Sequence, residues 1–131
     1  MIISKTENPP AYAQLLTVGS HTLRADIPSG EGGADSAPAP HDLFDAALSA
    51  CKTVTAHWYA KRTGMKLSAV EARVERDDTQ ERAGVYKLTV HMTYHGDLSE
   101  AERTKLHKAV MHCPIHKLMT TSEVIIETTP L

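Results

Sequence analysis

Two cysteines are the residues of this chain best suited to redox or nucleophilic chemistry. Cys51 falls in the middle of the most apolar segment, and Cys113 directly precedes Pro114. They lie 62 residues apart, which excludes the chemistry of a CxxC motif. Each can be interpreted as an inert buried thiol, a common state of a free cysteine. If the two meet in the fold, they supply a nucleophilic thiolate and a resolving thiol, the minimum needed to reduce a peroxide through a sulfenic acid and a disulfide.

The segment around Cys51 has the pattern of a helix from Pro40 to about Thr63. Pro40 suits a first helical turn, and Asp42 and Asp45 lie near the positive end of the helix dipole. The segment is apolar around most of its circumference, which predicts a helix buried on several sides. Cys51 is therefore expected in the middle of a central helix.

Cys113 follows a second predicted helix, which begins at a capping box in residues 99–102. Apolar residues then recur at one face of the helix, at Leu106, Ala109, Val110 and Cys113. This spacing predicts that Cys113 ends the apolar stripe. Pro114 must break the helix and can open another short one, whose N-terminal amides would lower the pKa of the Cys113 thiol.

The remaining segments predict strands and one loop. The predicted strands cover residues 11–18, 21–27, 69–76, 85–95 and 123–129. Residues 28–40, rich in Gly and Pro, are expected to form a loop or a lid. The order is β-β-α-β-β-α-α-β, which predicts one α+β domain over residues 1–131.

Composition limits the classes of protein that the chain can represent. The 131 residues include 14 Lys and Arg against 16 Asp and Glu, a net charge of −2, so no electrostatic footprint of a nucleic-acid-binding protein is present. No apolar run is long enough for a membrane span, and the first residues lack the pattern of a signal peptide. We therefore expect a cytoplasmic protein without nucleic-acid or membrane partners. Aromatic residues make up only 5%, which predicts a thin monomer core and favours a subunit partner.

The stretch APAPHDLFDAALSACKTVTAHWYAKRTGMKLSAVEARVE resembles the OsmC/Ohr family of small bacterial thiol peroxidases and stress-response proteins. The matching positions of its first motif are Pro40, Leu43, Ala47, Leu48, Cys51, Tyr59, Ala60, Arg62 and Gly64. A second family motif, a capped helix ending in Cys-Pro-(Val/Ile) before a further helix, is present as Cys113, Pro114 and Ile115. The resemblance spans roughly residues 20–129.

The resemblance implies an intertwined α+β homodimer in which two central helices cross and each site lies at the dimer interface. It also implies reduction of hydroperoxides, preferably organic ones. Cys51 would then be the peroxidatic cysteine and Cys113 the resolving cysteine. A dithiol reductant, either a lipoyl protein or a small thiol, would reset the pair, and no cofactor is implied.

The chain departs from the peroxidase pattern beside the first cysteine. Peroxidase members of the family have a Glu ten residues before the peroxidatic Cys, paired with an Arg that stabilises the thiolate. Here that position is His41, and a neutral imidazole cannot replace a carboxylate in holding a guanidinium. The neighbouring Asp42 is the candidate carboxylate. Arg24, in the N-terminal hairpin, is the candidate guanidinium, although a solvated strand residue explains it equally well.

Two other functions fit the same residues. A redox-silent, OsmC-like stress protein would hold a small apolar or electrophilic ligand in the interface pocket without efficient peroxidase activity. A metal site would use His112, Cys113 and His116, but zinc would need a further ligand to close the tetrahedron. Histidines exposed near a helix end explain the same pattern.

Overall fold

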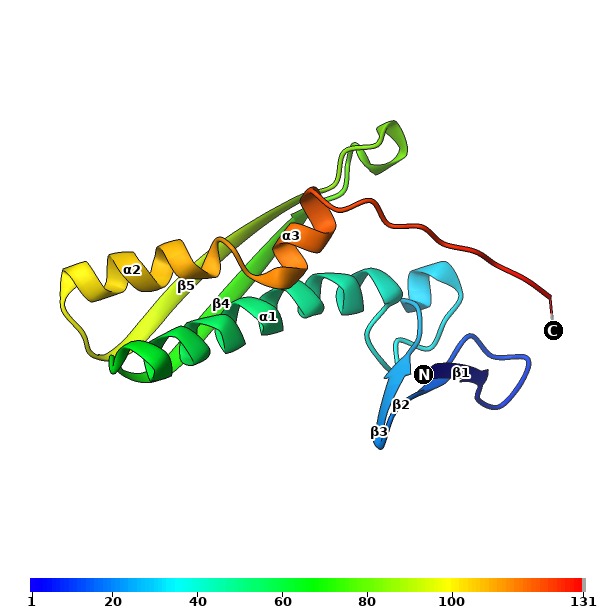
Figure 1. Cartoon of the computed structure of the whole chain (residues 1–131). Coiled ribbons are helices and arrows are strands. Elements are labelled where there is room, and N and C mark those ends of the chain that lie inside the picture. The colour runs from blue at the N-terminus through cyan, green and yellow to red at the C-terminus, as the bar shows by residue number, and fades with distance from the viewer. Residues whose placement is uncertain (131) are drawn as a thin grey trace. The chain divides into compact units, whose positions relative to one another are not determined.

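The computed structural model describes residues 1–130, which form two compact units, Met1–Phe44 and the part of the chain from Asp45 onward (Figure 1). The fold belongs to the α+β class: one group of strands precedes a long helix, and a β-hairpin and two further helices follow it. No helix in the described part of the chain is both long and apolar enough to cross a membrane.

The first unit contains a three-stranded antiparallel sheet in the order β1-β2-β3. β2 (Gln14–Val18) and β3 (His21–Ala25) form the predicted hairpin, and Gly19 adopts the left-handed conformation that its tight turn requires. β1 (Ile2–Thr6) was not predicted. All five of its residues are exposed, so no alternation of apolar and polar residues marks it as a strand.

The carboxylate of Asp26 anchors the loop that follows β3. It accepts hydrogen bonds from the backbone N–H groups of Ile27, Ala34 and Ser36 at 2.8, 3.3 and 3.1 Å, and from the Ser36 hydroxyl at 2.7 Å. These bonds lower the pKa of Asp26 from 3.8 to about 2, with the Ser36 hydroxyl making the largest contribution. The predicted loop is thus built around one side chain, with a 3-10 turn at Ser29–Glu31.

α1 (Pro40–Thr63) has the predicted bounds. Its start is capped by Asp42, whose carboxylate accepts the Ala39 N–H at 3.0 Å. From Asp45 onward, its buried residues form one stripe: Asp45, Leu48, Lys52, Ala56 and Ala60. Val54 and Trp58 are 66% and 58% exposed. The prediction of a helix buried on several sides is therefore wrong for a single chain, in which apolar residues on another side of α1 are exposed.

A long hairpin runs beside α1. β4 (Lys66–Asp77) pairs antiparallel with β5 (Lys87–Asp97), as predicted, with Val70 opposite Tyr94 and Val74 opposite Val90. The alternating pattern gives the hairpin one half-buried face and one exposed polar face. Helices therefore need to cover only one face of this pair of strands.

α2 (Glu100–Val110) and α3 (Pro114–Thr120) complete the second unit. The predicted capping box is present, since Ser99 accepts the Glu102 N–H at 3.2 Å and Glu102 accepts the Ser99 N–H at 2.8 Å. The buried core joins α1, β5 and α2 (Figure 1). Its members are Ala56, Ala60, Tyr94, Leu106 and Val110.

Two sequence predictions for the C-terminal part are wrong. The predicted strand at 123–129 is absent, because no described strand pairs with this segment, which leaves α3 as an extended chain (Figure 1). β-branched residues favour an extended conformation, but a strand also needs a neighbour for its backbone groups. Cys113 lies three residues beyond the end of α2 and is instead the N-cap of α3.

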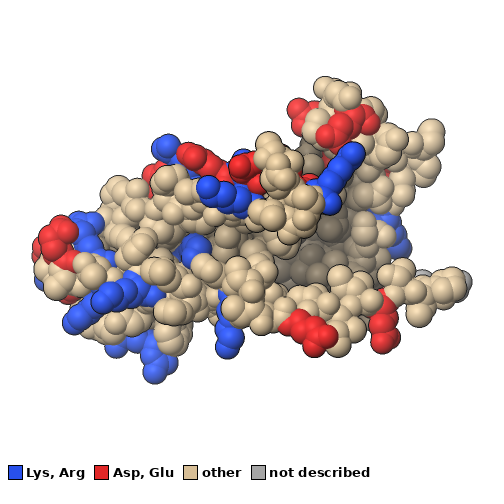
Figure 2. All heavy atoms as spheres, turned by 90° about the horizontal axis from the view of Figure 1, so that it is seen from above, with Lys and Arg blue, Asp and Glu red and all other residues tan. Residues whose placement is uncertain are grey.

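Both signs of charge occur on the face of the molecule shown in Figure 2. This distribution matches the near balance of 14 basic and 16 acidic residues in the sequence.

We predict that the amide shifts of Ala34 and Ser36 titrate together with a midpoint near pH 2, as followed by NMR. The pKa of Asp26 is lowered to about 2, so the loop bonds are present above its usual value of 3.8 and are lost as the pH falls through about 2. In Asp26→Asn this titration should disappear, and both shifts should already differ at neutral pH. A midpoint near 3.8 in the unmodified protein would contradict the anchoring role.

Candidate functional site

Cys51 and Cys113 come together in the second unit, although they are 62 residues apart in the sequence. Cys51 is a half-buried residue in the middle of α1, and Cys113 is a fully buried residue at the start of α3. Both are free thiols, and they lie near enough that Cys51 raises the pKa of Cys113. The sequence left open whether the two cysteines come together in the fold, and the structure places them near each other.

Burial raises the pKa of the Cys113 thiol above its ordinary value. The His116 backbone N–H donates to Cys113 Sγ at 3.4 Å and lowers this pKa, as expected at a helix start, but its effect is smaller than that of burial. The neighbouring Cys51 also raises the pKa, and the charge of Lys52 lowers it. The predicted effect of the following helix is therefore present, since its His116 amide lowers the pKa of Cys113, but burial outweighs it and the pKa is raised.

Lys52, the residue after Cys51, places a cation at this junction. Its side chain is buried, and Nζ donates to the Val110 carbonyl oxygen at 2.9 Å and to His116 Nδ1 at 3.2 Å. Val110 is the last residue of α2, so the ammonium lies at the negative end of that helix. Lys52 therefore connects α1 to both α2 and α3.

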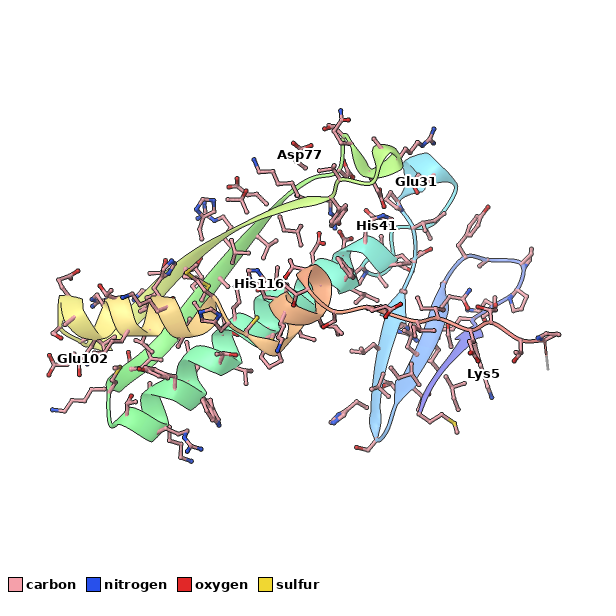
Figure 3. All side chains as sticks on the ribbon, turned by 45° about the horizontal axis from the view of Figure 1, so that its top comes forward. Lys5, Glu31, His41, Asp77, Glu102 and His116 are labelled. Carbon is pink, nitrogen blue, oxygen red and sulfur yellow. The ribbon has the colours of Figure 1, made fainter. Side chains whose placement is uncertain are left out.

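His116 completes the junction from α3 (Figure 3). An ammonium can only donate hydrogen bonds, so His116 Nδ1 must be the acceptor of the bond from Lys52 Nζ. The ring proton of a neutral His116 then lies on Nε2. Burial, followed by the charges of Lys52 and His112, lowers the pKa of His116. The imidazole is accordingly held in its neutral form.

A second polar cluster lies around the buried Asp45, which is on the same stripe of α1 as Lys52. Arg76 of β4 donates from Nε and Nη2 to Asp45 Oδ2 at 2.6 and 2.5 Å, and the Tyr86 hydroxyl donates to Oδ1 at 2.9 Å. Burial, reinforced by the Asp45 carboxylate, raises the pKa of Tyr86 to about 12. These bonds fix α1 against the hairpin.

Arg24 and Asp42, the other predicted site residues, belong to the first unit. The Arg24 guanidinium makes a two-bond ion pair with Glu7, with both N–O distances 3.0 Å, and this pair raises the pKa of Arg24. The Arg24 side chain is 64% exposed. Asp42 caps the start of α1. A carboxylate thus does pair with Arg24, but it comes from Glu7, which the sequence analysis did not consider.

Among residues 1–130, no three His, Cys, Asp or Glu side chains lie close enough together to hold a metal ion. Of the three residues considered for zinc, His116 uses Nδ1 to accept from Lys52, and Cys113 lies near Cys51. The structure of residues 1–130 therefore does not bring His112, Cys113 and His116 together as a set of three ligands.

Sequence reasoning missed Lys52, His116 as its acceptor, and the Asp45 group. A usable signal was present for two of them: Asp45 and Lys52 are seven residues apart and share a helix face with Leu48 and Ala56. A charged residue on the inward face of a helix needs a buried partner. The partners come from distant segments, which the sequence does not connect.

Comparison with known proteins assigns the family. The family model described as OsmC-like protein matches residues 32–129, and the chain belongs to this family. A search of curated protein sequences found no match.

Solved structures of low sequence identity share the fold. The OsmC-like protein of Mycoplasma pneumoniae has a TM-score of 0.74 at 18% identity, with 92% of this chain and 86% of that chain covered. The organic hydroperoxide resistance protein OsmC of Legionella pneumophila has a TM-score of 0.64 at 23% identity, with 92% and 90% covered. The organic hydroperoxide resistance protein OhrB of Bacillus subtilis has a TM-score of 0.62 at 20% identity, with the same coverage.

We predict that Arg76→Met lowers the free energy of unfolding by about 2–3 kcal/mol, because it leaves the Asp45 carboxylate largely buried without its cation. The loss should be smaller than for a fully buried pair, since the Arg76 side chain is 27% exposed. Tyr86→Phe should cost about 1 kcal/mol. Urea unfolding measures all three variants, with Arg73→Met on the exposed face of β4 as the control, expected within about 0.5 kcal/mol of the parent. Equal losses for Arg76→Met and Arg73→Met would contradict this role of the ion pair.

Proposed function

We propose that this OsmC-like protein reduces hydroperoxides, with organic hydroperoxides as the preferred substrates, through the pair Cys51 and Cys113. The observation that carries the proposal is the proximity of these two free thiols, one from α1 and the other from the start of α3. Two free thiols in contact can be oxidised to a disulfide and reduced again without a cofactor. The hydroperoxide resistance proteins among the structural relatives support the same activity.

The exposure of the two cysteines supports their division of roles. A peroxide must reach the attacking sulfur, and Cys51 is the half-buried member of the pair. Cys113 is fully buried, and burial raises its pKa, which disfavours the thiolate needed for the first attack. We therefore assign Cys51 as the peroxidatic cysteine and Cys113 as the resolving cysteine.

The proposed reaction has three balanced steps. The Cys51 thiolate attacks the terminal peroxide oxygen and the O–O bond breaks, so that Cys51 becomes a sulfenic acid and the alkoxide leaves as an alcohol after taking up a proton. Cys113 then attacks the sulfenic sulfur, and hydroxide leaves as water with the Cys113 proton. A dithiol reductant, either a lipoyl protein or a small thiol, finally transfers two electrons to the disulfide.

We propose that the working form is an intertwined homodimer of this one domain in the reducing cytoplasm. Val54 and Trp58 on α1, and the β-branched segment 124–126, are apolar and exposed in the single chain, which supports a partner subunit. In this proposal, Arg24 with Asp42 or Glu7 stabilises the Cys51 thiolate within the assembled site.

The test is peroxide turnover together with intact mass. Brief treatment with equimolar cumene hydroperoxide should remove about two hydrogens from the protein mass and block both cysteines from alkylation. Cys51→Ser should abolish turnover. Cys113→Ser should still form a sulfenic acid at Cys51 but no intramolecular disulfide.

Two freely alkylated thiols after this treatment, in folded protein, would refute the proposal. The redox-silent alternative would then apply, and saturable ligand binding that survives Cys51→Ser would be its signature.

A further inference from the structure

We propose that the Lys52 ammonium is the counter-charge of the Cys113 thiolate when Cys113 attacks the Cys51 sulfenic acid, and that His116 positions this ammonium. This inference rests on the proposed function and adds a positioning residue to the resolving step. It starts from a cation that the peroxide-reducing chemistry described above does not use. Lys52 is buried beside the junction of α1, α2 and α3.

A buried ammonium is costly unless acceptors and negative charge surround it. Lys52 Nζ has two acceptors in the fold, the Val110 carbonyl oxygen at 2.9 Å and His116 Nδ1 at 3.2 Å. Neither carries a full negative charge. The described structure thus provides hydrogen bonds to the ammonium at this junction, and the Cys113 thiol beside it is a group that can become an anion.

Cys113 is the thiol in question. Its side chain is fully buried, and Sγ accepts the His116 N–H at 3.4 Å. The Cys113 backbone N–H donates at 3.4 Å to the Val110 carbonyl oxygen that also accepts Lys52 Nζ, so the ammonium lies beside this residue, and its charge lowers the pKa of Cys113. The titratable groups recorded around it are Cys51 and Lys52 from α1 and His116 from α3, with His112 acting on His116. Because His116 is held neutral, Lys52 is the cation among them that directly favours the Cys113 thiolate.

The resolving step needs this thiolate. The Cys113 sulfur donates an electron pair to the Cys51 sulfur, the S–O bond of the sulfenic acid breaks, and hydroxide leaves as water with the proton that Cys113 has given up. Burial alone would keep Cys113 protonated. The Lys52 charge offsets part of that effect at the moment of attack, and its own hydrogen bonds keep it from moving away.

His116 has a defined part in this arrangement. Its backbone N–H contacts Cys113 and its ring nitrogen contacts Lys52, so one residue holds both the thiol and its counter-charge. Protonation of the ring would remove the Nδ1 acceptor and place a second cation beside Lys52. The lowered pKa of His116 keeps this acceptor available.

The first experiment measures the Cys113 titration without any need for turnover. In the Cys51→Ser protein, NMR of isotope-labelled cysteine follows the β-carbon shift of Cys113 against pH. Lys52→Gln keeps a hydrogen-bond donor but removes the charge, and it should raise the pKa of Cys113 by about one unit. Lys52→Arg should restore a value near that of the Lys52 protein. Lys61→Gln, at an exposed position of the same helix, should have no effect.

An unchanged Cys113 titration in folded Lys52→Gln, or an equal shift in Lys61→Gln, would overturn the proposal. If Lys52→Gln does not fold, Lys52→Met supplies an apolar chain of similar length and answers the same question, with the same expected rise.

The second experiment measures the resolving step in protein with both cysteines. A rise of one pKa unit lowers the thiolate fraction tenfold, but the more basic thiolate is more nucleophilic, so disulfide formation should slow about threefold at pH 7. The slower step leaves the Cys51 sulfenic acid exposed to more peroxide, and the fraction of Cys51 sulfinic acid measured by intact mass should rise accordingly. An unchanged sulfinic fraction in Lys52→Gln would overturn the kinetic role.

The failures of the two proposals are distinguishable. If peroxide oxidises neither cysteine of the unmodified protein, the proposed function fails, whereas the NMR titration still decides whether Lys52 is the counter-charge of Cys113.

Discussion

The buried Lys52 ammonium needs hydrogen-bond acceptors, and this requirement is the constraint on which the C-terminal part of this protein depends. The ammonium reaches the carbonyl that ends α2 and a ring nitrogen of α3, so these three helices must meet where the charge is. Apolar contacts among Ala56, Leu106 and Val110 favour packing of α1 on α2, but they tolerate sliding and rotation. A hydrogen bond from a buried charge does not, because a small displacement leaves the charge unpaired.

Asp45 provides the second fixed point of α1. It lies two helical turns before Lys52 on the same stripe, and its bonds to Arg76 and Tyr86 come from the hairpin. Two polar anchors at different heights fix both the rotation and the height of the helix. Cys51, one residue before Lys52, is rotated about 100° around the helix from the stripe and is only half-buried.

Sequence patterns predicted elements well where the signal is local. The bounds of α1, the pairing of β4 with β5 and the capping box at Ser99 each depend on residues within a few positions of one another. The patterns failed where the formation of a strand depends on pairing with another segment of the chain. β1 has no alternating pattern and exists because β2 pairs with it, and residues 123–129 have strand-forming residues but no described neighbour. The site shows the same division: the motifs identified both cysteines, whereas Lys52, His116 and Asp45 acquire their roles through contacts made by distant segments.

The separation of the two cysteines along the chain gives the redox state a mechanical consequence. A bond between Cys51 and Cys113 would close a loop of about 60 residues that contains the whole hairpin and α2. On the chain-entropy model, a cross-link over such a loop restricts the unfolded chain enough to stabilise the fold by roughly 4 kcal/mol. That is a large share of the net stability of a small domain, about 5–15 kcal/mol. The protein would then resist heat and proteolysis more strongly after exposure to an oxidant, until a reductant breaks the disulfide.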